Sequence, residues 1–420
     1  MATVTSSSTS SSTSRSASKS PPSGASTAAS SAEQQLLASI AELDPRLRAS
    51  GEAAEAARDL DAATVAALQD HGFFRIWRPT ALGGMELHPT AAVRVFEALA
   101  RVDSAAGWIV SNSAVITTFF QIFADEGLAE VFDEPDTIVA GGWFPPGAAV
   151  PSEGGYRVTG RWAFGSGCSH ADWVTGMTVI LDAAGQPELG PDGTPRLMLF
   201  AVPAAEAQVV EHWDTLGMRG TGSHDTAVTD VFVPARRTFA VGPFTSPGSA
   251  FTGPLYRFHM WLGGPEIAAI GLGVAAAALD RFLELAQRKA PSYTAQLLGD
   301  RPVVHDQVGR CAALLGAGRA YLHRALDDAN AAFEDGVALD PLGLAPVQLA
   351  SCFAVEAAAQ AVGLLQRAAG TSGIRVEDGL ERHFRDVHTI AQHTLAAAAR
   401  YESVGQLLAG KQSDWTFFYL

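Results

Sequence analysis

The chain has 420 residues, of which 47% are hydrophobic and 17% charged, and its formal net charge is −15. This composition supplies a large buried core and argues against overall disorder. So acidic a chain repels phosphate backbones and carries no basic patch, so we expect no nucleic-acid partner. No apolar run reaches the ~18–20 residues of a membrane span, so we expect no membrane partner either. The length favours two or three domains, because single cores stop growing near ~250–300 residues.

The first 32 residues form a low-complexity segment with 14 Ser, 5 Thr and no aromatic residue. Such a segment cannot bury enough apolar surface to fold, so we predict a disordered, dispensable tail over residues 1–32. A transit peptide is the alternative, but Arg15 and Lys19 are few basic residues for one.

Residues 33–137 have the pattern of a helical domain. Leu36, Leu37, Ile40 and Leu43 recur at a spacing of three to four residues, as on one face of a helix. A further helix is expected from Pro89 to about Arg101. Asp103 and Ser104 are suited to cap the helix that follows, which we expect to begin near Ala105.

Residues 138–237 have the pattern of a β domain, in which Gly and Pro separate short runs of β-branched and aromatic residues. The runs that predict strands are Tyr156–Thr159, Trp173–Ile180, Arg196–Val202, Gln208–His212 and Ala227–Val233.

Residues 238–420 return to a helical pattern that we assign to a C-terminal bundle. Long Ala- and Leu-rich stretches at 265–288, 303–334, 346–369 and 380–409 predict its helices. The whole chain therefore has an α+β organisation in the order helical, β, helical. The region 265–409 is more apolar than one subunit needs, which favours oligomerisation through these helices.

Several familiar kinds of site are absent from the sequence. The three cysteines, Cys168, Cys311 and Cys352, form no CxxC pair, which argues against a disulfide framework or zinc and favours a reducing cytoplasm. His388 and His393 are five residues apart, a poor spacing for sharing a metal on a helix. Ser223–Asp225 spells Ser-His-Asp, but adjacent strand residues alternate faces, so we expect a turn and no catalytic triad.

Seven short segments nevertheless occur in an informative order. They are Gly83-Gly84, Asp103–Trp108, Gly142–Gly147, Gly160–Gly167 with His170–Trp173, Trp213–Ser223, Gly370–Gly373, and Arg385-Asp386 followed by His393. With these segments the chain resembles the acyl-CoA dehydrogenase superfamily over about residues 34–415. The closer resemblance is to its monooxygenase branch, the oxygenase components of two-component flavin systems.

The resemblance implies an N-terminal helical domain, a central β-barrel or sandwich domain and a C-terminal helical bundle. It implies an oxygenase that takes reduced flavin, FMN or FAD, from a separate NAD(P)H:flavin reductase. The flavin would react with O₂ to a C4a-hydroperoxide and oxygenate carbon, nitrogen or sulfur of a small organic substrate. The absence of an NAD(P)H fingerprint fits a borrowed flavin. The family also implies a homotetramer, built as a dimer of dimers.

The position matching the usual dehydrogenase base separates the two branches. It holds Thr394, which cannot act as a general base at neutral pH, and no carboxylate follows until Glu402. In the monooxygenase branch a His at the position of His393 points at flavin and substrate, so His393 is the predicted catalytic residue; a core histidine is the alternative. We expected it to project inward from a helix with Ala397, Val404, Leu407 and Leu408, and its ordinary pKa near ~6.5 suits proton transfer.

The resemblance also implies a flavin-edge segment. Ser166 would place its hydroxyl near flavin N5, and Phe164 and Gly167 would border the same ring. Such a hydroxyl makes physical sense, because the C4a-hydroperoxide survives only while N5–H stays protonated and water is excluded. Trp143 and Phe144 would flank the flavin or the substrate. The alternatives are a Ser-Gly turn for Ser166 and ordinary core aromatics for the other pair.

A second group of residues corresponds to contacts that the family makes across subunits. Gly370, Thr371 and Ser372 match the stretch that approaches the flavin of a neighbouring subunit. Arg288 and Gln307 lie where the family contributes phosphate or adenine contacts.

Two departures from the phenol hydroxylases bear on the substrate. Ile116 stands where they carry a second His, and Gly141-Gly142 where they carry a Ser or Thr. The pocket is therefore expected to be more apolar, which favours an amine, a sulfur centre or a bulky polycyclic over a simple phenol. Two other functions stay open: an acyl-CoA dehydrogenase or desaturase with its base elsewhere, and a non-catalytic scaffold.

Overall fold

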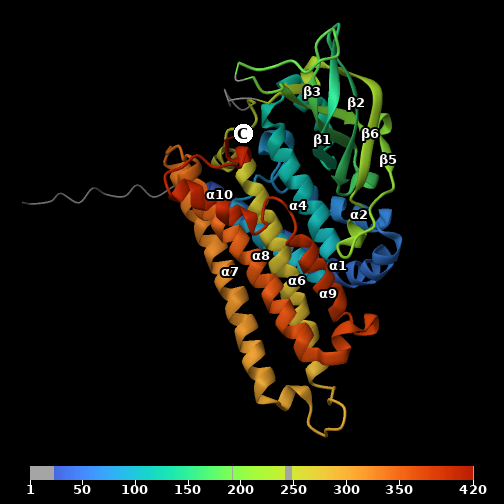
Figure 1. Ribbon diagram of the computed structural model, residues 1–420, viewed down its shortest axis with the longest axis vertical. Coiled ribbons are helices and arrows are strands. Elements are labelled where there is room, and N and C mark those ends of the chain that lie inside the picture. Colours follow the sequence, from blue (N-terminus) through green and yellow to red (C-terminus); the bar gives the residue numbers. More distant parts are fainter. Residues whose placement is uncertain (1–22, 192, 242–247, 420) are drawn as a thin grey trace, which may run out of the picture.

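The computed structural model describes residues 23–191, 193–241 and 248–419. A long helical body carries a β-sheet at one end (Figure 1). The first helix, α1 (Ser23–Ala57), begins ten residues before the end of the segment that we expected to be disordered. That boundary therefore lies too late in the chain, while residues 1–22 of the predicted tail lie outside the described residues.

The N-terminal helices form as the capping signals predict. Besides α1 they are α2 (Ala62–Asp70), α3 (Pro89–Val102), α4 (Ser104–Phe119) and α5 (Asp125–Val131). The Asp103 carboxylate accepts a hydrogen bond of 2.8 Å from the backbone N–H of Ala106, which confirms the predicted N-cap of α4. All but one residue of α4 are buried, because the helix lies between the sheet and the C-terminal helices (Figure 1).

The central domain is a seven-stranded sheet in the order β5-β6-β2-β1-β3-β4-β7. Its strands are β1 (Val139–Ser152), β2 (Gly155–Gly165), β3 (Trp173–Ile180), β4 (Leu197–Pro203), β5 (Gln208–Val210), β6 (His224–Pro234) and β7 (Thr238–Ala240). β1 pairs in parallel with β3, and the other pairs are antiparallel. A separate small core surrounds Trp162, whose indole N–H donates to the Met177 carbonyl over 2.7 Å.

The C-terminal helices surround α6 (Gly263–Ala286) and continue the main hydrophobic core. They are α7 (Pro302–Glu334), α8 (Pro341–Ala369), α9 (Leu380–Ile390) and α10 (Ala399–Leu408). The continuous helix expected over 380–409 is therefore wrong, since residues 391–398 form irregular turns between α9 and α10. Gln348 on α8 donates a side-chain hydrogen bond of 2.7 Å to the Leu395 carbonyl, which consequently does not continue a helical ladder.

Three helical segments in the described chain are long and apolar enough to cross a membrane: Ser104–Ile122, Pro254–Ala286 and Pro341–Ile374. The expectation that no apolar run is long enough to span a membrane is therefore not met when hydropathy is averaged over 18 residues. In this fold the most apolar window of each segment is 89%, 94% and 61% buried inside the protein, respectively. The apolar faces are accounted for by packing of one helix against another.

Candidate active site

Trp108 connects the helical domain to the sheet at the point where β2 ends. Its indole N–H donates a hydrogen bond of 2.9 Å to the Ser166 hydroxyl. Ser166 follows β2 within a tight turn, in which its backbone N–H bonds the Phe164 carbonyl over 2.9 Å and Gly167 adopts a φ of 71°. The Ser166 side chain is 7% exposed, so its hydroxyl sits at the edge of the protein interior.

Ser166 begins a row of three buried hydroxyl groups. Its oxygen lies 2.8 Å from the Ser223 hydroxyl, which lies 2.7 Å from the Thr221 hydroxyl. Thr221 donates onward to the Met218 carbonyl over 2.9 Å. The Ser223 hydroxyl therefore bonds the hydroxyl groups of Ser166 and Thr221, and not the side chains that follow it in the sequence.

The neighbours of Ser223 likewise bond elsewhere. His224 accepts backbone N–H groups from His212 and Trp213 on Nδ1, and Asp225 pairs with Arg161 at 2.7 Å. The expectation that Ser223–Asp225 forms no triad is confirmed.

His393 contacts the Trp108 indole. The two rings meet edge to face with centroids 5.6 Å apart and planes inclined by 67°. His393 lies in the turn between α9 and α10 and not on a helix, so the predicted helical stripe does not account for its direction. Within that stripe Val404 is buried, whereas Leu408 is 63% exposed.

The His393 imidazole is neutral at physiological pH. Burial lowers its pKa to about 4, which corrects the expectation of an ordinary value near ~6.5. The ring is partly buried, and its Nδ1 faces the backbone N–H of Leu395 at 3.4 Å. The side chain is thus suited to accept a proton or to donate a neutral N–H bond, and not to supply a positive charge.

The segment Trp213–Ser223 is held against α9 by a buried carboxylate. Asp386 accepts hydrogen bonds from the Met218 backbone N–H, at 2.6 Å, and from the Ser104 hydroxyl, at 2.8 Å. Burial raises its pKa, and the guanidinium of Arg382, at 3.7 Å, opposes that effect. The Arg385-Asp386 pair therefore positions the loop that carries the hydroxyl row; Arg385 itself donates to the Leu216 carbonyl.

The surface beside Ser166 carries a large exposed aromatic side chain. Phe164 is 68% exposed and has a φ of 64°, a strained value for a bulky residue. Its ring meets the Trp213 indole at a centroid distance of 6.1 Å. A large exposed aromatic held in a strained backbone next to a buried hydroxyl is the kind of surface that a ligand covers. Phe164, Ser166 and Gly167 thus share one turn at the end of β2, and their place beside a flavin stays a prediction.

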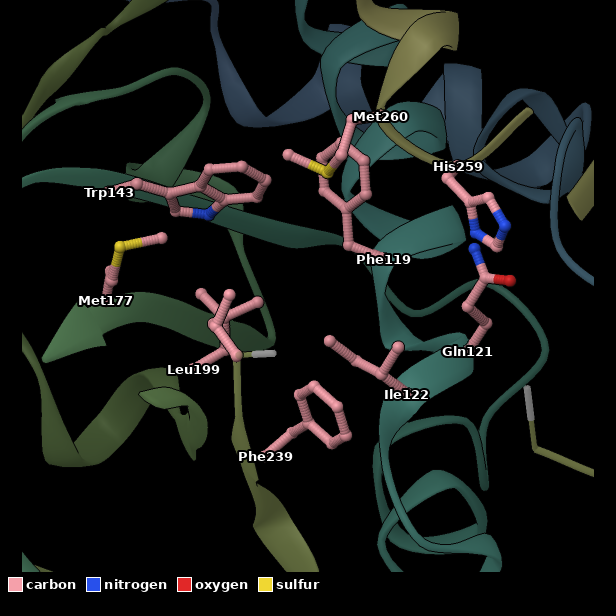
Figure 2. Close-up of a pocket in the computed structure, with 10 residues that line it drawn as sticks. Phe119, Gln121, Ile122, Trp143, Met177, Leu199, Phe239, His259 and Met260 are labelled. Atoms are coloured by element: carbon pink, nitrogen blue, oxygen red, sulfur yellow. The ribbon is translucent and has the colours of Figure 1, made fainter. Parts of the chain in front are cut away.

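Trp143 and Phe144 point to different surroundings. The Trp143 ring packs against the Phe119 ring, with a centroid distance of 4.7 Å, whereas the Phe144 side chain is 62% exposed. Figure 2 shows Trp143, Met177 and Leu199 facing the side chains of Phe119 and Ile122 across a cavity. This Trp143 cavity is small, with a volume of about 30 Å³, and its lining is mostly apolar.

The Trp143 cavity is separated from the Ser166 turn. Phe119 lies eleven residues after Trp108 on α4, which corresponds to about 16 Å along the helix axis. Gln121 and His259 provide the polar side chains of the cavity wall (Figure 2).

The two positions that differ from phenol hydroxylases have structural explanations. Ile116 is 6% exposed in the core. A Cβ at Gly141 or Gly142 would collide with a backbone carbonyl oxygen, of Thr175 or of Ala163. A Ser or Thr therefore requires the backbone to move, which supports the expected loss of polar groups.

A second cleft brings Arg288 together with the segment after α8. Its lining includes Arg288, Lys289, Thr371, Ser372 and Arg375. The Lys289 ammonium donates to the Ser372 hydroxyl over 2.7 Å. The lining also includes Glu377, which pairs with Arg375 at 2.6 Å, and Asp378, which lies 3.8 Å from the Arg288 guanidinium, so two of the three cations already face a carboxylate.

The remaining members of the predicted cross-subunit set lie around or apart from this cleft. Gly370 ends α8 with a φ of 58° and so turns the chain into the cleft. Gln307 lies near the start of α7, is half-buried, and is not among the residues lining the cleft.

The dehydrogenase alternative finds no carboxylate at its usual position. Thr394 and Glu402 are both exposed. The buried carboxyl on an earlier helix is Glu266 of α6, which is 3% exposed and bonded to the Ser111 hydroxyl. Burial raises its pKa to about 8, so it is largely protonated at neutral pH. Within the described ranges no group of three His, Cys, Asp or Glu side chains is placed to bind a metal.

Sequence reasoning missed the partners of Ser166. Trp108, Thr221 and Ser223 stand in two of the seven ordered segments, but were not assigned to the site. Their roles depend on contacts 57 and 58 residues apart in the chain. One signal could have found them: the segments Asp103–Trp108 and Trp213–Ser223 occur together with the Ser166 segment, in the same order, in the family that the chain resembles.

Comparison with known proteins identifies the family to which the chain is similar. Models for the acyl-CoA dehydrogenase N-terminal and C-terminal domains match residues 30–130 and 266–398. An indole-3-acetate monooxygenase from Pseudomonas putida is 31% identical over 84% of this chain and 88% of its own length. The flavin-dependent monooxygenase oxygenase subunit HsaA from Mycobacterium tuberculosis is 30% identical over 86% of this chain and 91% of its own.

A solved structure shows the same fold at full length. XiaF from a Streptomyces species, in complex with FADH2 and glycerol, has a TM-score of 0.86 and 25% identity, covering 93% of this chain and 98% of that one. The chain therefore belongs to the acyl-CoA dehydrogenase family. Within that family it is an oxidoreductase of the flavin-dependent monooxygenase branch.

Proposed function

We propose that the protein is the oxygenase component of a two-component flavin-dependent monooxygenase. The observation that carries the proposal is the Trp108 indole, which bonds the Ser166 hydroxyl and meets the His393 ring. A flavin laid against Phe164 would have Ser166 at its edge. Bound reduced flavin, FMN or FAD, would supply an oxygen atom from O₂ through its C4a-hydroperoxide. The relatives named as FADH2-dependent or as oxygenase subunits support this assignment and a separate reductase.

The residues of the site have distinct tasks in this proposal. Ser166 would bond N5 of the flavin, and the buried surroundings of Ser166 and Trp108 would exclude water. His393, being neutral, would accept a proton from the substrate or donate its N–H to the transferred oxygen. Arg288, with Thr371 and Ser372, lines a cleft that would bind the phosphate end of a flavin, and the family resemblance implies that this flavin belongs to a neighbouring subunit.

The substrate class that we propose is an aromatic compound with few polar groups. Relatives are named for indole-3-acetate and for resorcinol. The buried Ile116, at the position where the phenol hydroxylases carry a second His, favours apolar ring contacts over several hydrogen bonds. The position of the ¹⁸O atom in the product of the assay below shows whether carbon, nitrogen or sulfur is oxygenated.

We also propose a homotetramer in a reducing cytoplasm. Large apolar side chains are exposed on the C-terminal region, as oligomer contacts require: Leu283, Val303, Tyr321, Leu342, Ile374, Val376 and Leu408. The three cysteines are buried and free, and burial raises the pKa of each thiol, so none is suited to disulfide exchange. Light scattering at micromolar concentration tests the assembly; a stable monomer would contradict it.

The test of function supplies chemically reduced FMN or FAD, ¹⁸O₂ and a panel of aromatic compounds that includes indole-3-acetate and resorcinol. We expect a product that carries one ¹⁸O atom, with the second atom released as water; turnovers that form no product release H₂O₂. Reduction of an artificial acceptor by acyl-CoA thioesters, without oxygenated product, would establish the dehydrogenase alternative. Failure to bind flavin at all would support a scaffold.

A further inference from the structure

One arrangement of its protons fills every contact of the hydroxyl row that begins at Ser166. The row contains three O···O contacts, of 2.8, 2.7 and 2.9 Å, and three hydroxyl protons to fill them. Each contact needs one proton, because two oxygen atoms at these distances repel when none lies between them. Ser166, Ser223 and Thr221 are 7%, 4% and 0% exposed, which leaves little room for water to supply another.

The carbonyl at the far end sets the direction of the row. The Met218 oxygen can only accept, so the Thr221 proton fills that contact. Ser223 must then donate to Thr221, and Ser166 must donate to Ser223. At the near end the Trp108 N–H, which can only donate, occupies one acceptor position of Ser166. Ser166 therefore has no proton left and offers a single remaining lone pair.

We propose that Ser223 and Thr221 are positioning residues that make Ser166 an obligate hydrogen-bond acceptor and so select reduced over oxidised flavin. This inference rests on the proposed function, in which Ser166 borders flavin N5. Reduced flavin carries a proton on N5 and can donate to Ser166. Oxidised flavin presents a lone pair at N5, which faces the lone pair of Ser166 and gains no bond. An oxygenase that receives reduced flavin from a partner benefits from releasing the oxidised form.

The experiment compares dissociation constants of reduced and oxidised FMN and FAD, measured anaerobically with the full-length protein. We expect the wild type to bind reduced flavin more tightly. Ser223→Ala removes the acceptor for the Ser166 proton, and Thr221→Val frees the Ser223 proton to point at Ser166. In both variants Ser166 can donate to oxidised N5. The preference for reduced flavin should fall by about five- to a hundredfold, the range for a buried polar group that regains a partner.

Matched variants separate this effect from loss of packing. Thr221→Ser and Ser223→Thr keep the hydroxyl groups and should keep the wild-type preference. Thr178→Val removes a buried threonine hydroxyl that donates to the Met198 carbonyl in the sheet, outside the row, and should also keep it. A tenfold loss of preference corresponds to a change of ~30 mV in the midpoint potential of the bound flavin, which gives a second readout.

A probe of the wild type covers the case in which the variants do not fold. 5-Deazaflavin carries C–H in place of the N5 lone pair, so its oxidised form should bind several-fold more tightly than ordinary oxidised flavin. Equal or weaker binding of the deazaflavin overturns the inference. So does an unchanged preference in folded Ser223→Ala and Thr221→Val. Either result leaves the proposed function intact if reduced flavin still binds, whereas absence of any flavin binding contradicts the proposed function itself.

Discussion

The Trp108 indole N–H donates a hydrogen bond of 2.9 Å to the Ser166 hydroxyl. This bond connects the N-terminal half of helix α4 to the turn that follows β2. The same indole contacts the His393 ring edge to face. One side chain thus contacts both residues that the sequence predicts to be functional, although neither is near the other in the chain.

Replacing Trp108 with Phe tests this connection. The variant keeps an aromatic ring against His393 but removes the donor to Ser166, which costs about 0.5–1.5 kcal/mol in unfolding free energy. We expect a small fall in melting temperature and a several-fold fall in product formed per O₂ consumed. The Ser166 proton stays committed to Ser223, so the preference for reduced flavin should remain. Wild-type coupling in a folded Trp108→Phe protein would show that the bond is not needed.

The buried carboxylate of Asp386 should dominate the stability of the Trp213–Ser223 loop. Asp386→Ala leaves the buried Met218 N–H and Ser104 hydroxyl without their acceptor, and removes one of the carboxylates around Arg382, which keeps its pair with Asp103 at 3.0 Å. Removing one member of such a buried set costs about 3–5 kcal/mol. Chemical denaturation measures this difference.

The matched control for Asp386 is Asp328→Ala. Asp328 pairs with Arg324 at 2.6 Å on the exposed face of α7, and loss of a surface pair costs about 0–1 kcal/mol. Similar destabilisation by the two substitutions would mean that Asp386 does not organise the loop.

Glu266 should make the stability of the protein fall as the pH rises. Burial raises the pKa of its carboxyl to about 8 in the folded state, from an ordinary value of 4.5. Between these values the unfolded chain has lost the proton that the folded chain keeps, so stability decreases with pH throughout this window. The accumulated loss is about 3 kcal/mol at pH 7.

Glu266→Gln removes this pH dependence. The variant should gain stability over the wild type as the pH rises from 5 to 8, with little difference at pH 5. Glu284→Gln, an exposed carboxylate on the same helix, is the control and should show no such trend. Parallel melting-temperature profiles for wild type and Glu266→Gln would exclude a buried, protonated Glu266.

The sequence predicts the helices and most strands because their signals are local. Asp103 caps α4 through a residue three positions away, and α3 begins at a proline as expected. β1 is not among the predicted strands, because Gly142–Gly147 contains two prolines and two glycines, which have weak β-propensity. Its pairing with β2 and β3 depends on tertiary contacts that override those preferences.

The site is less predictable than the fold for the same physical reason. Residues 391–398 have the composition of a helix, but the Gln348 amide captures the Leu395 carbonyl and leaves His393 in a turn. The Ser166 hydroxyl row likewise depends on a loop that Asp386 positions from 168 residues away. Family order identifies Ser166 and His393, whereas the direction of their hydrogen bonds requires the structure.

His393 provides the sharpest test of the proposed mechanism. One positioned proton-transfer group typically contributes about 10²–10⁴-fold to a rate. We expect His393→Ala to keep its fold and to bind reduced flavin, because the side chain is only partly buried and its ring contact with Trp108 is a single edge-to-face pair. O₂ consumption should continue with release of H₂O₂, while product falls at least tenfold, a conservative floor for such a group.

The pH dependence distinguishes a neutral His393 from a cationic one. With a pKa of about 4, the imidazole takes up no proton between pH 6 and 8, so coupling should not change through that range on its account. His393→Gln, which is neutral and can donate a hydrogen bond but cannot serve as a base at these pH values, separates the two remaining roles. Near-wild-type coupling in His393→Gln would assign hydrogen-bond donation, and loss equal to that of His393→Ala would assign proton acceptance. Wild-type product per O₂ in His393→Ala, at an unchanged melting temperature, would instead make His393 a packing residue and remove it from the site.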